Sequence, residues 1–199
     1  MKLKITKTMH KILICRHSTR DIQPVDCNIS QEGINIIDEK INDIKKLILN
    51  PIYIITSPYR RTIETAQCIS AHYDLNVPII TENQIEEVMF HESQKECIGE
   101  PLKRLLCWNS DKPLENWNSV HGRTKKYLMD IQKNIHIDDN KEYICVTHGG
   151  IINSMLTYID STYTFDLNNT NPHKYIPNYC EYIVIEITRE SINVVHKSF

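Results

Sequence analysis

The sequence has no long apolar run and no leader-like start. No apolar stretch approaches the ~18 residues that a membrane-spanning helix requires. The N-terminus is basic, but the apolar stretch that follows it covers only residues 12–15, which is too short for the core of a signal peptide. We therefore expect a cytoplasmic protein without a membrane partner.

The chain also lacks an excess of charge of either sign. It has 23 lysines and arginines and 25 aspartates and glutamates, which gives a net charge of -2. Because a protein that binds a polyanion usually carries a basic surplus, we expect no nucleic-acid partner. With 199 residues, of which 41% are hydrophobic, the chain is long enough for one domain with a sizeable core.

Cysteine and histidine are both present, but not at the spacings of a metal site. The seven cysteines are an odd number and include no Cys-x-x-Cys pair, which argues against a disulfide scaffold and against a zinc site. The nine histidines form no His-Glu-x-x-His motif. We therefore expect free thiols, no metal and no cofactor.

Short apolar runs alternate with helical periodicities along the chain. Isoleucines at positions 34, 37, 41, 44 and 48 recur at steps of three and four, which predicts a helix with Ser30 as its N-cap. The same reasoning predicts helices over 62–73, 120–135 and 151–159, and strands over 12–15, 52–56, 77–80, 143–147, 182–187 and 192–195, the last two as an antiparallel hairpin.

This alternation predicts an α/β fold, namely a three-layer α/β/α sandwich with a mostly parallel central sheet. We expect one domain over residues 1–199. The most polar and least periodic part, residues 92–118, indicates an insertion or lid within it.

Cationic side chains follow three of the expected strands. The segments after these strands are 16–20 (Arg-His-Ser-Thr-Arg), 57–61 (Ser-Pro-Tyr-Arg-Arg) and 148–150 (His-Gly-Gly). The carboxyl ends of parallel strands meet at one edge of a sheet, where ligands collect. Guanidinium groups match paired phosphate oxygens, and glycines at a helix start let backbone N–H groups approach an anion. The pattern predicts a phosphate-binding pocket.

His17 and Cys15 are the candidate nucleophiles for chemistry in such a pocket. Cysteine phosphatases need Cys, five residues and then Arg, whereas Arg20 is one position short and Asp21 stands in its place. Cys15 also belongs to the strand itself. A neutral imidazole is nucleophilic near pH 7, and neighbouring arginines disfavour its protonated form. His17 is therefore the better candidate.

Three motifs in register resemble the histidine phosphatase superfamily, which includes phosphoglycerate mutases and related phosphatases. Arg16-His17-Ser18 resembles the Arg-His-Gly motif, and segment 57–66 resembles Ser-x-Leu-x-Arg-Ala-x-x-Thr-Ala. His148-Gly149 resembles the strand-terminal His-Gly motif. The resemblance spans residues 12–150 and implies a phosphoglycerate mutase-like fold.

The resemblance also implies a role for each matched residue. His17 would be the nucleophile that forms a phosphohistidine, and Glu87, with Glu86 in reserve, would be the general acid. The phosphoryl group would be held by Arg16, Arg61, His148 and Gly149, with Arg20 as a further clamp. The implied activity is metal-independent hydrolysis of a phosphomonoester.

Two positions depart from the family pattern and leave alternatives open. Ser18 replaces a glycine: if the position needs a positive φ the serine is strained, and otherwise its hydroxyl could bind phosphate. His91 stands where mutase-like members carry glycine. A mutase and a catalytically weak phosphate-binding module are the alternatives to a phosphomonoester hydrolase.

The substrate would be a small phosphorylated molecule or a phosphoprotein, but no motif identifies it. We expect segments 92–118 and 161–178 to set the specificity. No motif indicates the oligomeric state.

Overall fold

The computed structural model describes residues 8–20, 27–74, 76–87, 117–134, 140–160, 162 and 177–199. The expected insertion or lid at 92–118 lies outside these residues apart from its last two positions, which belong to a helix. His91 and nearly all of segment 161–178 also lie outside them.

A six-stranded mixed sheet forms the middle of the molecule. In chain order its strands are β1 (His10–Arg16), β2 (Pro51–Thr56), β3 (Ile79–Thr81), β4 (Lys141–Thr147), β5 (Tyr182–Ile187) and β6 (Ile192–Lys197). Their order across the sheet is β3-β2-β4-β1-β5-β6. The first four run parallel, β5 is antiparallel to β1, and β6 pairs antiparallel with β5. The predicted parallel sheet and C-terminal hairpin are confirmed.

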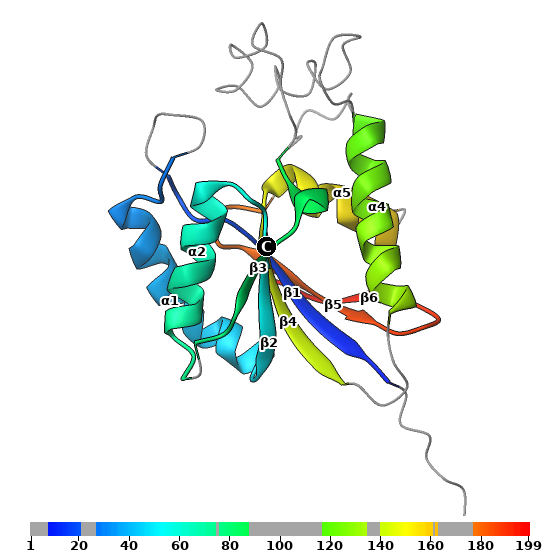
Figure 1. Cartoon of the computed structure of the whole chain (residues 1–199), viewed down its shortest axis with the longest axis horizontal. Coiled ribbons are helices and arrows are strands. Elements are labelled where there is room, and N and C mark those ends of the chain that lie inside the picture. The colour runs from blue at the N-terminus through cyan, green and yellow to red at the C-terminus, as the bar shows by residue number, and fades with distance from the viewer. Residues whose placement is uncertain are drawn as a thin grey trace, which may run out of the picture.

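Helices cover both faces of the sheet. The helices α1 (Gln31–Leu47) and α2 (Arg60–Ala71) pack on one face, and α4 (Trp117–Lys133) and α5 (Gly149–Ile159) pack on the other (Figure 1). A short 3-10 helix, η1 (Asn83–Ile85), follows β3. The predicted three-layer α/β/α sandwich is therefore confirmed.

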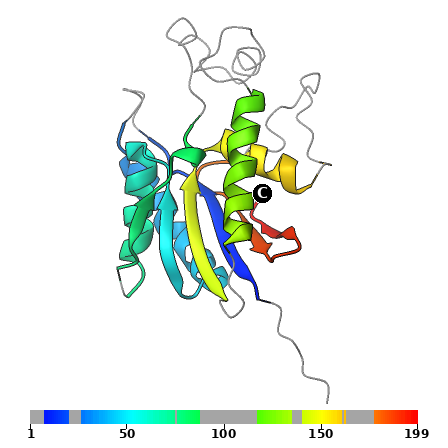
Figure 2. The same ribbon diagram turned by 45° about the vertical axis from the view of Figure 1, so that its right-hand side comes forward.

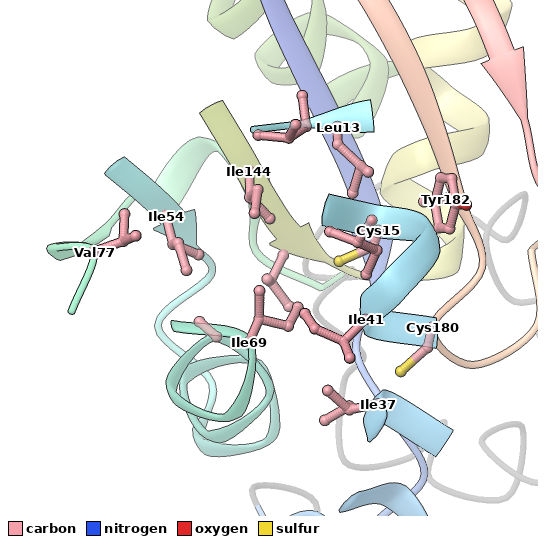
Figure 3. Packing of buried hydrophobic residues seen from close by; sticks show 14 of the residues in the cluster. Leu13, Cys15, Ile37, Ile41, Ile54, Ile69, Val77, Ile144, Cys180 and Tyr182 are labelled. Carbon is pink, nitrogen blue, oxygen red and sulfur yellow. The ribbon is translucent and has the colours of Figure 1, made fainter. Parts of the chain in front are cut away.

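The central strands are buried on both faces, which explains their continuous apolar sequences. In β1, Leu13 and Cys15 point to the side of α1 and α2, where they join a core with Ile41 and Ile69 (Figure 3). Ile12 and Ile14 belong to the second core, on the side of α4 and α5. The two cores hold the parallel strands rigidly, so the residues that follow each strand have fixed positions.

Helix α1 begins at the residue that the sequence predicts. Ser30 caps it, since its Oγ accepts a hydrogen bond from the Gly33 N–H at 3.1 Å. The buried side chains of Ile37, Ile41 and Ile44 then hold the helix against the sheet.

The first turn of α1 lies directly against the loop that follows β1. The Ser30 N–H donates to the Thr19 carbonyl at 3.0 Å, and the Ser18 hydroxyl donates to the Gly33 carbonyl at 2.7 Å. A Cβ placed on Gly33 would lie 2.5 Å from the Thr19 carbonyl oxygen. Position 33 must therefore remain glycine for this loop to keep its shape.

Substitution of this glycine should show how closely the loop depends on α1. Gly33→Ala is expected to lower the free energy of unfolding by about 1–3 kcal/mol, because the Thr19 backbone must move to relieve the overlap. Chemical denaturation measures the change.

Gly122→Ala in α4 is the matched control. No atom lies within 4 Å of a Cβ at that position. Alanine there should therefore leave stability unchanged or raise it by up to about 1 kcal/mol, as it does in helix interiors. Equal effects of the two substitutions would contradict the argument.

Candidate active site

The carboxyl ends of β1, β2 and β4 lie side by side because β4 pairs with both of the other strands. Two backbone hydrogen bonds hold the loops beyond these ends: the His17 N–H donates to the Thr147 carbonyl at 2.9 Å, and the Ser57 N–H donates to the Val146 carbonyl at 3.1 Å. The rings of His17 and His148 are consequently only 5.2 Å apart, centroid to centroid. The sequence places these two residues 131 positions apart, and the sheet brings them together.

His17 has a defined tautomer. Its Nδ1 lies 2.7 Å from the Ser18 carbonyl oxygen, which can only accept a hydrogen bond, so Nδ1 carries the proton. Its Nε2 accepts a hydrogen bond from Nε of Arg61 at 3.2 Å. Burial, together with His148 and Arg61, holds the pKa of His17 well below its usual value. The Nε2 lone pair is therefore available at neutral pH.

His148 is the residue immediately before α5 and is fully buried. Its Nδ1 faces Nη2 of Arg61 at 3.2 Å, and its Nε2 faces Oγ of Ser57 at 2.8 Å. Because an arginine only donates, Nδ1 accepts and Nε2 carries the proton. Burial, followed by the charges of Arg61 and Arg16, holds the pKa of His148 well below its usual value.

Arg61 is the guanidinium that joins the two imidazoles. It is only 3% exposed, and it lies 4.6 Å from the centre of the Tyr59 ring. Burial lowers its pKa, while the Glu87 carboxylate, 3.8 Å from Nη2, opposes that effect. A buried cation between two uncharged imidazoles makes the space between these side chains, called the hollow below, attractive to an anion.

Glu87 reaches the same hollow from the segment beyond η1. Its Oε2 lies 3.5 Å from Nδ1 of His148, and its side chain is 21% exposed. Glu86 instead offers its backbone carbonyl to Arg123 at 2.8 Å. Of the two neighbouring glutamates, Glu87 is the one whose carboxylate is beside Arg61 and His148.

Two side chains fix the segment that carries Glu87. Arg123 of α4 donates to the carbonyls of Gln84 at 2.7 Å and of Glu86 at 2.8 Å. The hydroxyl of Thr147 donates to the Ile85 carbonyl at 2.7 Å. A change at Arg123 would therefore reach Glu87 through the backbone.

Arg16 is held by the turn before β5, close to His17. Its Nη1 donates to the Pro177 carbonyl at 2.9 Å, and its guanidinium lies 4.3 Å from the centre of the Tyr179 ring. The same ring lies 5.7 Å from that of His17. Cys180 follows with a φ of 56°, a left-handed conformation that costs a non-glycine residue energy. This strained turn sets the position of Tyr179.

Ser18 does not have the geometry expected of a phosphate ligand. Its φ is not positive, so the serine is not strained, but its side chain is fully buried. Its hydroxyl donates to the Gly33 carbonyl and its backbone N–H donates to Thr65 at 3.1 Å. The Ser18 proton thus holds α1 against the loop, and the phosphate role of the Ser18 hydroxyl stays a prediction.

Arg20 and Gly149 complete the set of predicted site residues. Arg20 is half-buried in a bridge with Ile29, and its charge is close enough to lower the pKa of both Arg61 and His148. Gly149 is the first residue of α5, where the helix does not use the backbone N–H groups. Both are positioned to add positive potential to the hollow.

Cys15 lies inside β1, and burial raises the pKa of its thiol well above the usual value, as expected for a structural cysteine. The cysteines of the described segments are free, as the sequence predicts. Within those segments no group of side chains could hold a metal ion, and no helix is long and apolar enough to cross a membrane.

Four residues at the site were not among the predicted ones. They are Ser57, Tyr59, Arg123 and Tyr179. Ser57 and Tyr59 lie within the second motif and could have been found by their position in it. Arg123 and Tyr179 belong to no motif, and no signal in one sequence links them to the strand ends.

A profile of the histidine phosphatase superfamily (branch 1) matches residues 12–198. The chain belongs to this superfamily. The match extends beyond the three motifs and includes the C-terminal hairpin, and His17, Arg61 and His148 all fall within it. No curated protein matches this histidine phosphatase family member in sequence.

Solved structures share the fold across nearly the whole chain. Phosphoglycerate mutase from Bacillus anthracis superposes with a TM-score of 0.72 at 15% identity, covering 96% of this chain and 93% of the other. Mycobacterial glucosyl-3-phosphoglycerate phosphatase gives 0.67 at 16% identity, with 96% and 97% covered. Phosphoserine phosphatase from Entamoeba histolytica gives 0.66 at 20% identity, with 94% and 96% covered. At these identities the likeness establishes the fold of this chain and not its activity or substrate.

Proposed function

We propose that this protein is a phosphomonoester hydrolase that works through a covalent phosphohistidine on His17. The observation that carries the proposal is the Nε2 lone pair of His17, which is held neutral beside the buried guanidinium of Arg61 at 3.2 Å. A nucleophile and a cation for the transferred phosphoryl group are thus adjacent.

In the first step, Nε2 of His17 attacks phosphorus. The N–P bond forms as the ester P–O bond breaks, and the leaving oxygen takes a proton from the protonated Glu87 carboxyl. The entering phosphoryl group replaces the hydrogen bond between Arg61 and His17 with charge-assisted bonds from the guanidinium to its oxygens. The product is phosphohistidine and a free alcohol.

In the second step, water attacks the phosphohistidine. Glu87, now a carboxylate, accepts a proton from that water while the N–P bond breaks and inorganic phosphate forms. Glu87 thus ends the cycle protonated, as it began. Arg16, Arg61, Arg20 and the Gly149 N–H would stabilise the charge on the phosphoryl oxygens.

His148 would respond to the phosphoryl group by taking up a proton. Its pKa is held low by burial and by cations, and a phosphoryl dianion offsets the effect of the cations. Protonated Nδ1 could then donate to a phosphoryl oxygen. The three arginines supply the positive charge that a metal ion supplies in other phosphatases, so we propose that turnover requires no metal.

A small phosphorylated molecule is the proposed substrate. Two of the similar structures are named for phosphatases, one acting on phosphoserine and one on glucosyl-3-phosphoglycerate. Phosphoryl transfer of the mutase type is the second candidate, because a phosphoglycerate mutase is also among the similar folds. Incubation with 3-phosphoglycerate and bisphosphoglycerate separates them: a hydrolase releases inorganic phosphate, whereas a mutase interconverts the phosphoglycerates.

Removal of the nucleophile tests the proposed reaction. The purified protein is expected to hydrolyse 4-nitrophenyl phosphate at an unchanged rate in excess EDTA. His17→Ala should lose on the order of 10³-fold or more in kcat/KM, because the substitution removes the nitrogen that forms the bond to phosphorus. Release of nitrophenolate measures both.

His72→Ala is the control, since this exposed histidine at the end of α2 contacts Asp38 and not the hollow. It should retain full activity. Inhibition by EDTA, or an active His17→Ala protein, would refute the mechanism.

Substrates with different leaving groups distinguish the role of Glu87 from that of Glu86. Glu87→Gln should reduce kcat/KM by on the order of 10²–10⁴-fold for an alkyl phosphate, whose alkoxide needs a proton as it leaves. The loss in kcat/KM should be much smaller for 2,4-dinitrophenyl phosphate, whose leaving group is stable without one.

Glu86→Gln is the matched variant one position away, and its kcat/KM for both substrates should stay near that of the unchanged protein. If Glu86→Gln lost activity and Glu87→Gln kept it, the proton transfer would belong to Glu86, and the assignment to Glu87 would be wrong.

A further inference from the structure

Arg123 belongs to no motif, yet it is joined to the segment that carries Glu87. It lies on α4, the helix that covers one face of the sheet and packs against η1 (Figure 2). Its Nη1 donates to the Gln84 carbonyl at 2.7 Å, and its Nη2 donates to the Glu86 carbonyl at 2.8 Å. One planar guanidinium thus binds two carbonyls, the nearer of which belongs to the residue directly before Glu87.

The end of a helix leaves backbone carbonyls that the helix itself does not satisfy. Here η1 ends at Ile85, and Glu86 is already extended, with φ of -63° and ψ of 156°. The carbonyls of residues 84, 85 and 86 all accept hydrogen bonds from side chains. Arg123 donates to the outer two, and the Thr147 hydroxyl donates to the middle one at 2.7 Å. The three carbonyls before Glu87 are therefore anchored to α4 and β4.

The anchor on β4 connects this segment to the hollow. Thr147 directly precedes His148, and Oε2 of Glu87 lies 3.5 Å from Nδ1 of His148. Arg123 supplies the second anchor, from a different layer of the fold. With two anchors, the backbone before Glu87 has a fixed position relative to His148. The reach of the Glu87 carboxylate into the hollow is thus set before any substrate binds.

The shape of the Arg123 side chain matters here as well as its charge. Two donors in one rigid plane can bind two carbonyls at the same time, whereas the ammonium of a lysine is a single point on a flexible stem. The charge of Arg123 also contributes, after burial and the charges of Arg61 and Arg16, to the lowered pKa of His148. A lysine at position 123 would keep this charge and lose the planar pair of donors.

We propose that Arg123 is a positioning residue for proton transfer, and that it acts on the Glu87 carboxylate through the backbone of residues 84–86. It would not touch the substrate. The inference rests on the proposed function, in which Glu87 is the acid and base. Without the two hydrogen bonds from Arg123, the carboxylate would no longer be held beside the leaving oxygen. Proton transfer would become slow, whereas attack by His17 would continue.

Arg123→Met should therefore show the kinetics of a misplaced acid. Its kcat/KM for an alkyl phosphate should fall by on the order of 10–10²-fold, because the leaving alkoxide needs a proton. Its kcat/KM for 2,4-dinitrophenyl phosphate should fall by less than about threefold, because that leaving group needs none. The ratio of the two values is the measurement, since it does not depend on how much of the sample is folded.

Two further variants separate positioning from charge and from helix stability. Arg123→Lys should recover only part of the loss with the alkyl phosphate, because it restores the charge without the paired donors. Lys126→Met removes a cation from the exposed face of the same helix and should leave both kcat/KM values unchanged.

A double variant tests whether Arg123 acts through Glu87. Once Glu87→Gln has removed the acid, its position no longer matters, so adding Arg123→Met should cause little further loss of kcat/KM for the alkyl phosphate. Losses that multiply would show that Arg123 acts independently of Glu87, and would overturn the inference.

Two other results would overturn it as well. One is an equal loss of kcat/KM for both substrates in Arg123→Met, and the other is full activity of Arg123→Lys. If Glu87→Gln depends on the leaving group and Arg123→Met does not, this inference alone is wrong. If Glu87→Gln itself shows no such dependence, the proposed role of Glu87 is wrong and the inference fails with it.

Discussion

The buried guanidinium of Arg61 is the constraint on which the site depends. A cation at 3% exposure has lost most of its hydration, and two imidazoles accept hydrogen bonds from it without carrying charge. Burial, and then the positive charge beside them, lower the pKa of both His17 and His148. One carboxylate, Glu87, opposes the charge from 3.8 Å. An anion bound beside Arg61, as proposed above, would compensate this buried charge.

The fold provides this arrangement with few specialised parts. Three adjacent parallel strands end at one edge, and the residue after β1, the residue after β4 and the second residue of α2 meet there. Contacts behind the hollow keep these residues in place. The close approach of Gly33 to the Thr19 carbonyl fixes the loop of His17, and Arg123 and Thr147 fix the segment of Glu87. The positions of the reactive groups are thus set by contacts to the backbone of the segments that carry them.

Periodicity and motif spacing predict most of the fold and the centre of the site. The buried strands and the helix capped by Ser30 follow from local patterns, and the strand-end rule brings His17, His148 and segment 57–61 together without any knowledge of the family. The choice of Arg61 within that segment came from the family resemblance. Element ends were less predictable: α2 begins two residues before the expected position, and β3 is displaced to Ile79–Thr81. The contact between the Ser18 hydroxyl and Gly33 was not predictable, because Gly33 is 15 positions away and the contact exists only after α1 has packed. Tyr179 and Arg123 act through tertiary contacts that have no local pattern.

The central claim is that Nε2 of His17 forms a bond to phosphorus. Rapid quenching of the Glu87→Gln protein with 2,4-dinitrophenyl phosphate tests it most directly, because this substrate can load the enzyme without an acid while loss of the base slows hydrolysis of the intermediate. Mass spectrometry under alkaline conditions, in which phosphohistidine survives, should find one phosphoryl group on the peptide that contains His17. Attachment to Cys15 or to a serine, or steady turnover with no phosphorylated peptide at any quench time, would contradict the account.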